Sequence, residues 1–157
     1  MKPGNYTQMY VHLVFAVKRR EAALTKEIRS EIFEYISGII TNMNHKSIIV
    51  NGVSDHIHIL IGMNPSQSIS DTVHHIKRNS SLYINKNGLC KGRFSWQEGF
   101  GGFTYSRSQI GNVYRYIENQ EKHHEKSNFK DEYVKTLKRF QIDYNDEYLF
   151  NFWNSVQ

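Results

Sequence analysis

The amino-acid sequence predicts an α+β fold: a ferredoxin-like or RRM-like split βαβ arrangement with an antiparallel sheet, plus additional C-terminal helices, one of which bears a tyrosine of interest. Short runs of β-branched and aromatic residues predict the strands, and stretches with apolar residues every three or four positions predict the helices. The order is β-α-β-β-α-β-α-α, whose first six elements place two helices on one face of the sheet. We expect residues 1–157 to form a single domain.

The N-terminal part of the chain predicts a strand followed by a helix. Residues 9–18 (MYVHLVFAVK) are rich in β-branched and aromatic residues and are long enough for a central strand. Thr25 is a suitable N-cap, and apolar residues from Ile28 to Met43 follow it at helical spacing. This pattern predicts an amphipathic helix of about 18 residues.

The middle of the chain predicts a hairpin and a second helix. Two apolar runs, residues 47–53 and 56–63, are separated by Ser54-Asp55, a pair typical of turns. The helix that follows is expected to end at the Asn87-Gly88 pair, and its apolar stripe consists of Ile69, Val73, Ile76 and Tyr83.

The C-terminal half predicts a broken strand and two further helices. Residues 94–106 hold aromatic residues among glycines, which favours one or two strand pieces with a kink or a close backbone approach. A third helix is expected from about residue 109 to the pair at 123–124, and a fourth from about residue 127 to residue 140. The aromatic tail, residues 144–153, lacks a period and is expected to pack on a neighbouring surface.

The charge and composition of the chain limit the kinds of partner it is expected to bind. The net charge of +5 and the pI near 9.3 favour a polyanion, and the aromatic content of 13% suits stacking on single-stranded bases. The single cysteine, Cys90, excludes an intramolecular disulfide and a cysteine-based zinc site. The sequence contains neither a run of roughly 20 apolar residues nor the apolar region of a secretory signal. We therefore expect a cytoplasmic protein with no membrane partner.

Two histidines in a predicted strand form the first candidate site. His56 and His58 are two positions apart, so their side chains point to the same face, close enough to hold one ion. The alternative is that both merely occupy a solvated strand face. Their context favours a site, because they are the only polar pair in an otherwise apolar strand. Two histidines leave a divalent cation under-coordinated, so a third ligand is expected.

The third predicted helix offers that ligand. Tyr116 and Gln120 are four positions apart and share one helix face. The opposing face carries the apolar stripe and is expected to face the core, which assigns Tyr114 to packing together with Ile110, Val113 and Ile117. A phenol and an amide on the other face can reach a shared site. The alternative for Tyr116 is an ordinary surface tyrosine.

Together these residues resemble the single-tyrosine HUH transposases of single-strand insertion sequences. The H-U-H triplet, where U is a bulky apolar residue, stands at 56–58, and a Tyr-Ile-x-Asn-Gln helix stands at 116–120. The segments 96–103 (WQEGFGGF) and 119–124 (NQEKHH) also resemble theirs. The resemblance covers the chain from about Tyr6 to Tyr148.

The resemblance implies an enzyme that cuts and rejoins single-stranded DNA. In that family two histidines and the helix glutamine bind Mg²⁺ or Mn²⁺, which here implies His56, His58 and Gln120. It also implies that Tyr116 attacks the scissile phosphate and forms a 5′-phosphotyrosine. Family members are homodimers that recognise DNA hairpins at the ends of the mobile element.

Basic residues in three clusters are candidates for contacts with DNA phosphates, although each could equally be a solvated surface charge. They are Lys18, Arg19, Arg20, Lys77, Arg78, Lys91 and Arg93. The pairs His74-His75 and His123-His124 are predicted to be surface or DNA-contacting residues, because adjacent helical side chains diverge by about 100°. His12 is predicted to pack or to support the histidine pair.

Other functions stay open at this stage. A non-catalytic nucleic-acid binder with an RRM-like sheet is disfavoured, because the sequence lacks the basic-aromatic strand motif of that class. Replication initiators and relaxases of the wider HUH class are usually longer. A metal-dependent phosphodiesterase would use the histidine pair and water, without a tyrosine. A non-mobile HUH nuclease acting on repetitive palindromes would carry the same motif.

Overall fold

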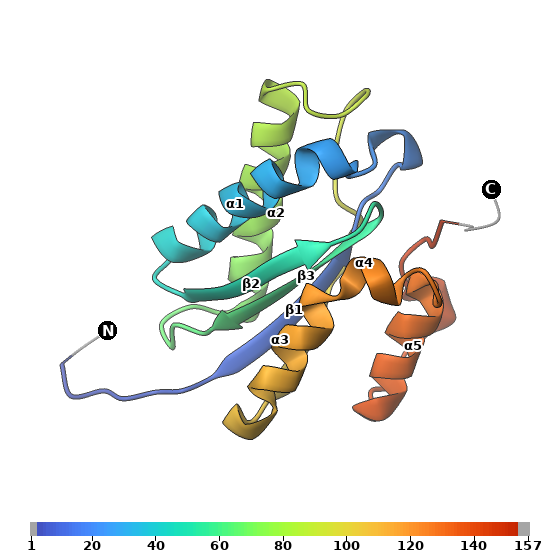
Figure 1. The fold of residues 1–157 in the computed structure, drawn as a ribbon. Coiled ribbons are helices and arrows are strands. Elements are labelled where there is room, and N and C mark those ends of the chain that lie inside the picture. The colour runs from blue at the N-terminus through green and yellow to red at the C-terminus, as the bar shows by residue number, and fades with distance from the viewer. Residues whose placement is uncertain (1–2, 154–157) are drawn as a thin grey trace.

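Four antiparallel strands form one sheet in the computed structural model, which describes residues 3–153 (Figure 1). Residues 1–2 and 154–157, which the predicted domain includes, lie outside the described residues. The strands are β1 (Tyr10–Ala16), β2 (Lys46–Gly52), β3 (His56–Gly62) and β4 (Gly101–Tyr105), in the spatial order β2-β3-β1-β4. Strand β1 pairs with both β3 and β4, which confirms the predicted split βαβ arrangement.

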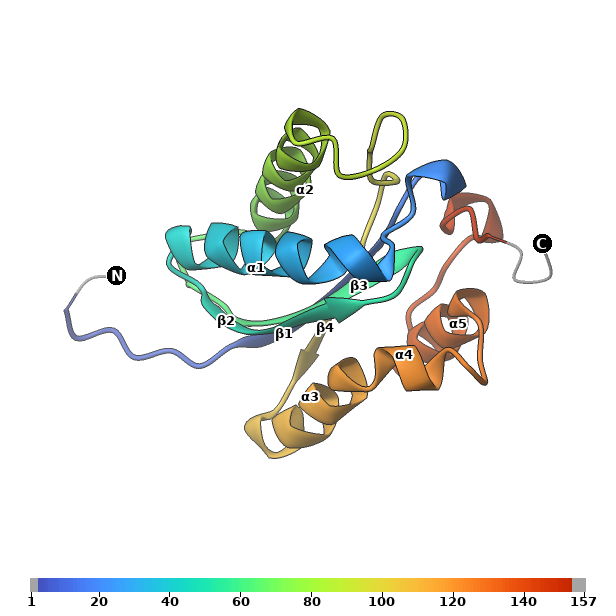
Figure 2. The same ribbon diagram turned by 45° about the horizontal axis from the view of Figure 1, so that its top comes forward.

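Helices α1 (Lys26–Asn42) and α2 (Ile69–Lys86) cover one face of the sheet (Figures 1 and 2). The main core lies between them and the sheet, where Ile57, Ile59 and Ile61 of β3 are fully buried. Alternation along the strand therefore turns His56 and His58 to the opposite face. No helix of residues 3–153 is long and apolar enough to cross a membrane.

The opposite face of the sheet carries the C-terminal helices α3 (Ile110–Glu118), α4 (Gln120–His123) and α5 (Phe129–Arg139) (Figure 2). Short 3-10 turns occupy Arg20–Ala22, Arg107–Gln109 and Asp146–Tyr148. A second, smaller core forms where Leu60 of β3 packs against Val113 and Ile117 of α3.

The third predicted helix is interrupted, which the sequence analysis did not foresee. Asn119, with φ −95° and ψ 21°, separates α3 from α4. The side chain of Asn51 on β2 donates hydrogen bonds to the carbonyls of Ile117 and Glu118, 2.8 and 3.1 Å away. These contacts satisfy carbonyls at the end of α3 and tie that end to the sheet. Gln120 consequently turns inward and is completely buried.

The glycine-rich segment forms two strand pieces, as predicted: an isolated bridge between Val17 and Trp96, and then β4. The expected close backbone approach is at Gly101. A Cβ added there would lie 2.8 Å from the ring and hydroxyl of Tyr133 on α5. The missing side chain therefore allows α5 to pack directly on β4.

Replacing Gly101 with alanine is expected to lower the free energy of unfolding by about 1–3 kcal/mol, because Tyr133 has to move. Gly102→Ala is the matched control, since its added Cβ would come no closer than 3.6 Å to a neighbour. Urea denaturation of both variants measures the difference. Equal stabilities would show that α5 does not pack on β4 as described.

The end of the aromatic tail packs against α5 as expected, whereas Tyr144 and Tyr148 in its first half are exposed. Phe150 is buried and stacks on Phe129 with ring centroids 5.8 Å apart. The amide of Gln97 donates to the carbonyl of Asn151 and accepts from its backbone N–H, at 2.8 and 2.7 Å. These contacts hold the tail beside α5.

Candidate active site

The histidine pair lies on the sheet face that α3, α4 and α5 cover. His56 and His58 are both buried, and their ring centroids are 5.0 Å apart. Each directs its Nε2 towards one oxygen, Oε1 of Glu132, at 3.2 Å from His56 and 3.1 Å from His58. The strand thus delivers both imidazoles to one point, as the two-residue spacing predicts.

Glu132 is the central residue of the site, and it was not among the residues predicted from the sequence. It lies on α5, more than seventy positions after the histidine pair, and only 5% of it is exposed. The predicted fourth helix offered a signal, because Glu132 lies three positions after Phe129 and so falls on the apolar face. A carboxylate on a buried helix face is costly unless it has partners.

The second oxygen of Glu132, Oε2, faces the residues of α3 and α4. The hydroxyl of Tyr116 donates a hydrogen bond to it, and Gln120 Nε2 donates a second at 3.2 Å. His123 Nε2 and His124 Nε2 also lie 3.2 Å from this oxygen. One carboxylate therefore joins the histidine pair, the tyrosine and the glutamine that the sequence analysis singled out.

The expected divergence of His123 and His124 was wrong, although the side chain of His123 is 37% exposed, as predicted for a surface residue, and a DNA contact stays a prediction. Both side chains reach the same carboxylate oxygen, although adjacent helical residues diverge. The reason is that α4 ends at His123, so His124 lies beyond its last helical position. Their target, Glu132, comes from another helix that packs across this end. The pair His74-His75 is exposed on α2, as expected.

Two further contacts orient the strand histidines. Asp55 Oδ1 lies 2.8 Å from His56 Nδ1, and His12 Nε2 lies 2.8 Å from His58 Nδ1. A hydrogen bond at Nδ1 fixes the ring and leaves Nε2 as the outward-facing nitrogen. His12 is buried on β1, which confirms that it supports the pair.

Burial and charge act in opposite directions within the cluster. Burial favours the neutral form of Glu132, but the adjacent imidazoles of His124, His56 and His58 hold its pKa far below the ordinary value. Burial likewise disfavours charge on His56, yet Asp55 and Glu132 raise its pKa to about 8. Burial and then the charge of Glu132 raise the pKa of Tyr116 well above its usual value. A phenol in this setting keeps its proton unless a positive charge approaches.

The donor set fits a divalent cation. Among the described residues, buried atoms that lack a hydrogen-bond partner include His56 Nε2, Gln120 Oε1 and His124 Nε2, all within this cluster. Donor atoms of His56, His58 and Glu132 all lie within 4.8 Å of one another. Their 3.1–3.2 Å spacings match the roughly 3 Å that separates adjacent ligands at bond lengths of about 2.1 Å.

Tyr116 also borders an open cavity of about 580 Å³ between α3 and α5. Tyr105, Lys135 and Arg139 line it, so it offers aromatic and cationic groups next to the hydroxyl. Tyr114, which the sequence analysis assigned to packing, is instead 37% exposed, so that assignment was wrong. Its neighbours Val113 and Ile117 carry the packing on α3.

Residues 5–120 match the model of a known family, described as Transposase IS200 like. The chain belongs to the IS200-like transposase family. It is 26% identical over 122 residues to the ISDra2 transposase TnpA of Deinococcus radiodurans, covering 74% of this chain and 87% of that one. The family confirms a transposase and agrees with the predicted DNA binding.

Two solved structures share the fold of this transposase. A crystal structure assigned as a transposase from Deinococcus radiodurans aligns with a TM-score of 0.60 at 24% identity, over 76% of this chain and 96% of that chain. A REP-associated tyrosine transposase bound to a REP hairpin aligns with a TM-score of 0.58 at 12% identity, over 98% of both chains. The family match ends at Gln120, before His123, His124 and Glu132.

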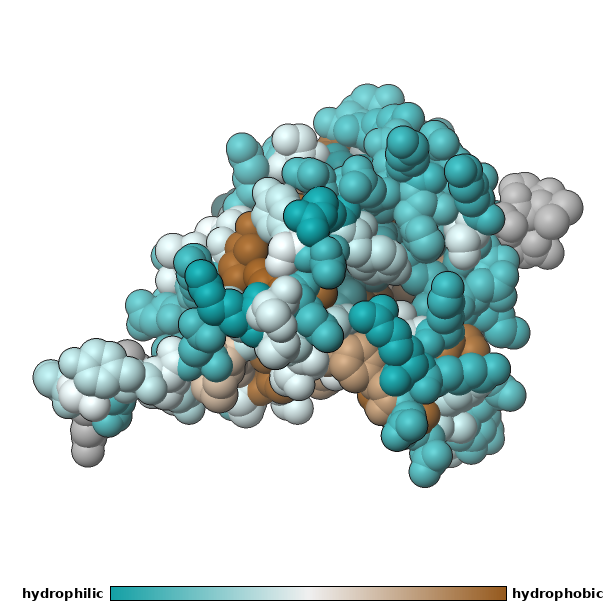
Figure 3. Space-filling model, turned by 60° about the horizontal axis from the view of Figure 1, so that its bottom comes forward, coloured by the Kyte–Doolittle hydropathy of each residue, from teal (hydrophilic) through white to brown (hydrophobic). Residues whose placement is uncertain are grey.

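Most of the basic residues predicted to contact DNA are exposed on the transposase, and their role stays a prediction. These exposed residues are Lys18, Arg19, Arg20, Arg78, Lys91 and Arg93. Figure 3 brings the lower side of Figure 1 forward and shows hydrophilic side chains with apolar ones in several separate places. Lys77 differs, because its Nζ donates to the carbonyls of Gln97 and Gly99, at 2.8 and 2.7 Å. Partial burial also lowers the pKa of Lys77 to about 8.

Replacing Lys77 with methionine is expected to lower the free energy of unfolding by about 1–3 kcal/mol, because two carbonyls lose their donor. Arg78→Met is the matched control, since Arg78 is exposed on the same helix. Urea denaturation tests stability, and hairpin DNA titration tests binding. A Lys77→Met variant of unchanged stability but weakened DNA binding would favour the predicted phosphate contact instead.

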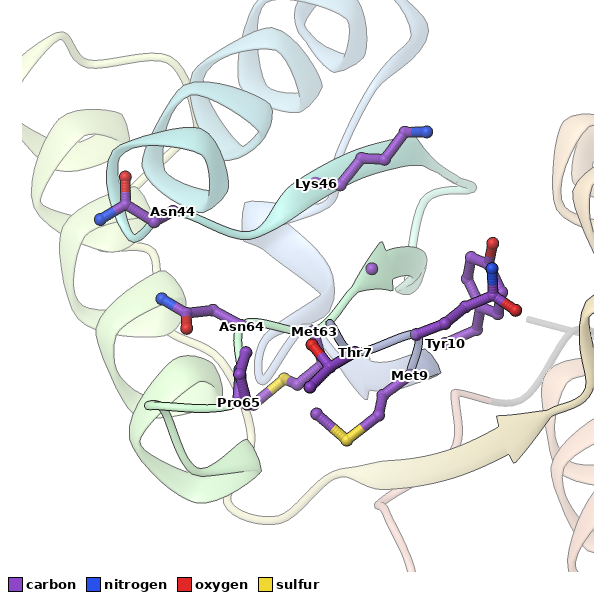
Figure 4. A pocket seen from close by; sticks show the side chains of 10 residues that line it. Thr7, Met9, Tyr10, Asn44, Lys46, Met63, Asn64 and Pro65 are labelled. Carbon is purple, nitrogen blue, oxygen red and sulfur yellow. The ribbon is translucent and has the colours of Figure 1, made fainter. Parts of the chain in front are cut away.

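Another cavity, of about 320 Å³, lies at the other end of the sheet (Figure 4). Met9, Met63, Asn64 and Lys46 are among its lining residues, and none of the cluster around Glu132 borders it. The cluster around Glu132 therefore lies at the cavity beside Tyr116 and away from this one.

Proposed function

We propose that this transposase cuts and rejoins single-stranded DNA through Tyr116, with Mg²⁺ or Mn²⁺ held by His56, His58 and Gln120. One observation carries the proposal. The Tyr116 hydroxyl and the Nε2 atoms of both strand histidines contact the same carboxylate, that of Glu132. The Tyr116 hydroxyl and the imidazoles that could bind a cation therefore lie on either side of one carboxylate. Phosphoryl transfer requires such proximity of the nucleophile and the cation.

The residues have separate tasks in this chemistry. When bound, the cation supplies Lewis-acid polarisation of the scissile phosphate. Asp55 and His12 hold the two imidazoles in the orientation that presents Nε2. The Tyr116 oxygen forms a bond to phosphorus as the bond to the 3′-oxygen breaks, which yields a 5′-phosphotyrosine and a free 3′-hydroxyl. The phosphodiester energy is retained, so a second 3′-hydroxyl can reverse the step.

The substrate proposed is single-stranded DNA with hairpin ends. The REP-associated transposase of similar fold is bound to a hairpin, which supports this choice. The cavity beside Tyr116 adds Tyr105 for stacking and Lys135 and Arg139 for phosphates. Tyr116 and the two strand histidines of the same chain contact one carboxylate, so the site is assembled within a single chain. We propose separately that the protein acts as a homodimer.

The test is a search for the covalent intermediate. The full chain is incubated with end-labelled, hairpin-containing single-stranded DNA and Mn²⁺, and the products are run on a denaturing protein gel. We expect a labelled band that co-migrates with the protein and disappears after protease treatment. Cleavage without that band would instead indicate a metal-dependent phosphodiesterase. Binding without cleavage would indicate a non-catalytic nucleic-acid-binding protein.

A further inference from the structure

Glu132 separates four histidines into two sets. His56 and His58 lie next to Oε1, whereas His123 and His124 lie next to Oε2. The first set is the cation site of the proposed function. The second set has no place in that function, although its two imidazoles and one carboxylate are as close together as those of the first.

The second set has the composition and spacing of a metal site. The donor atoms of His123, His124 and Glu132 all lie within 4.8 Å of one another. Each imidazole nitrogen is 3.2 Å from the carboxylate oxygen, close to the roughly 3 Å expected between ligands of one ion. His124 Nε2 is buried and makes no well-aligned hydrogen bond among the described residues, although Glu132 Oε2 lies 3.2 Å away, which is the arrangement of two ligands that face one ion. Two histidines and a carboxylate form a common protein ligand set for Zn²⁺ and related ions.

We propose that His123, His124 and Glu132 bind a second divalent cation, with Glu132 bridging it to the cation at His56 and His58. The inference deepens the proposed function and rests on it for the first cation. Carboxylate-bridged pairs of ions about 3.5–4 Å apart occur in phosphatases, nucleases and polymerases, where they stabilise the attacking and the leaving oxygens. The second ion lies on the side of Glu132 that contacts the Tyr116 hydroxyl, which is the side of the attacking oxygen.

The donor chemistry also predicts which ions bind. The two sets together offer four imidazoles and a single carboxylate, and imidazole favours Mn²⁺, Zn²⁺ and Ni²⁺ over Mg²⁺. Mg²⁺, which prefers oxygen ligands, is therefore expected to fill the second site less readily than Mn²⁺.

The experiment counts ions on the full chain without DNA. The protein is titrated with Mn²⁺, and the electron paramagnetic resonance signal of free Mn²⁺ gives the number bound. We expect two per wild-type chain and the spectrum of a spin-coupled pair. The double variant His123→Ala/His124→Ala is expected to bind one ion and to lose the coupling. The double variant His74→Ala/His75→Ala, an exposed histidine pair on α2, controls for surface histidines and is expected to retain two.

Three outcomes would overturn the proposal. The first is that the wild-type chain binds one ion, and the second is that the His123→Ala/His124→Ala variant binds two. The third is that this double variant folds but binds no ion, which would indicate a single shared site. Circular dichroism checks that each variant is folded. Failure of the second metal site can be distinguished from failure of the proposed strand-transfer function. Two bound ions without any DNA adduct would refute strand transfer alone, and an adduct with one bound ion would refute the second site alone.

Discussion

Tyr116→Phe is expected to abolish the covalent DNA adduct and to reduce strand cleavage by about 10⁴-fold or more, whereas Tyr114→Phe leaves both unchanged. Phenylalanine has no oxygen to attack phosphorus, so no phosphotyrosine can form. Tyr116 is half-buried, and its hydroxyl contacts Glu132 inside the cluster. Tyr114 lies two positions away on the same helix and is exposed, which makes it a matched control.

The denaturing gel assay measures the covalent adduct and the cleavage products of both variants, and titration with hairpin DNA measures their DNA affinity. Phenylalanine keeps the ring, which lies edge-on to His58 with centroids 5.7 Å apart, so the fold and DNA binding are expected to persist. An adduct that survives in Tyr116→Phe and vanishes in Tyr114→Phe would show that the nucleophile is misassigned. Cleavage that is unaffected by either change would point to water as the attacking group.

The fold was predictable because its signals are local. Apolar residues recur at every second position in a strand and at every third or fourth position in a helix, and these patterns predict the strands and the two helices that cover the sheet. The interruption at Asn119 was not predictable in this way, because it depends on Asn51, a residue of β2 that caps the end of α3. A contact between residues more than sixty positions apart leaves no period in the sequence.

The site was predictable only where its residues share an element. The spacing of His56 and His58 places both on one face of β3. Tyr116 and Gln120 were predicted to share one helix face, but Tyr116 lies on α3 and Gln120 begins α4, and they come together because both contact Glu132. Glu132 comes from a different helix, so only the packing of α5 on the sheet reveals that it joins the two pairs. The exposure of Tyr114 has a similar cause, because Val113 and Ile117 are the α3 residues buried against the sheet, with Ile110 and Tyr116 packed beside them.

Glu132→Gln is expected to remove Mn²⁺ binding at both histidine sets and to reduce cleavage by about 10- to 100-fold. The substitution keeps the size of the side chain but replaces an anionic donor with a neutral amide. One of its two polar atoms then carries hydrogens and repels a cation. Among the described residues, Glu132 is the one carboxylate that touches both sets, so its loss cannot be offset from within the cluster.

Thermal and urea unfolding with and without Mn²⁺ measures this loss independently of DNA. A ligand that binds only the folded chain stabilises it by about 2.7 kcal/mol per site at 100 times its Kd. We expect that increment in the wild type and in Glu125→Gln, an exposed glutamate of the same segment, but not in Glu132→Gln. Full Mn²⁺ stabilisation of Glu132→Gln would mean that His56, His58 and Gln120 hold the cation without the carboxylate. Glu132 would then act by positioning the histidines and Tyr116, and only β3 and α4 would supply ligands to the cation.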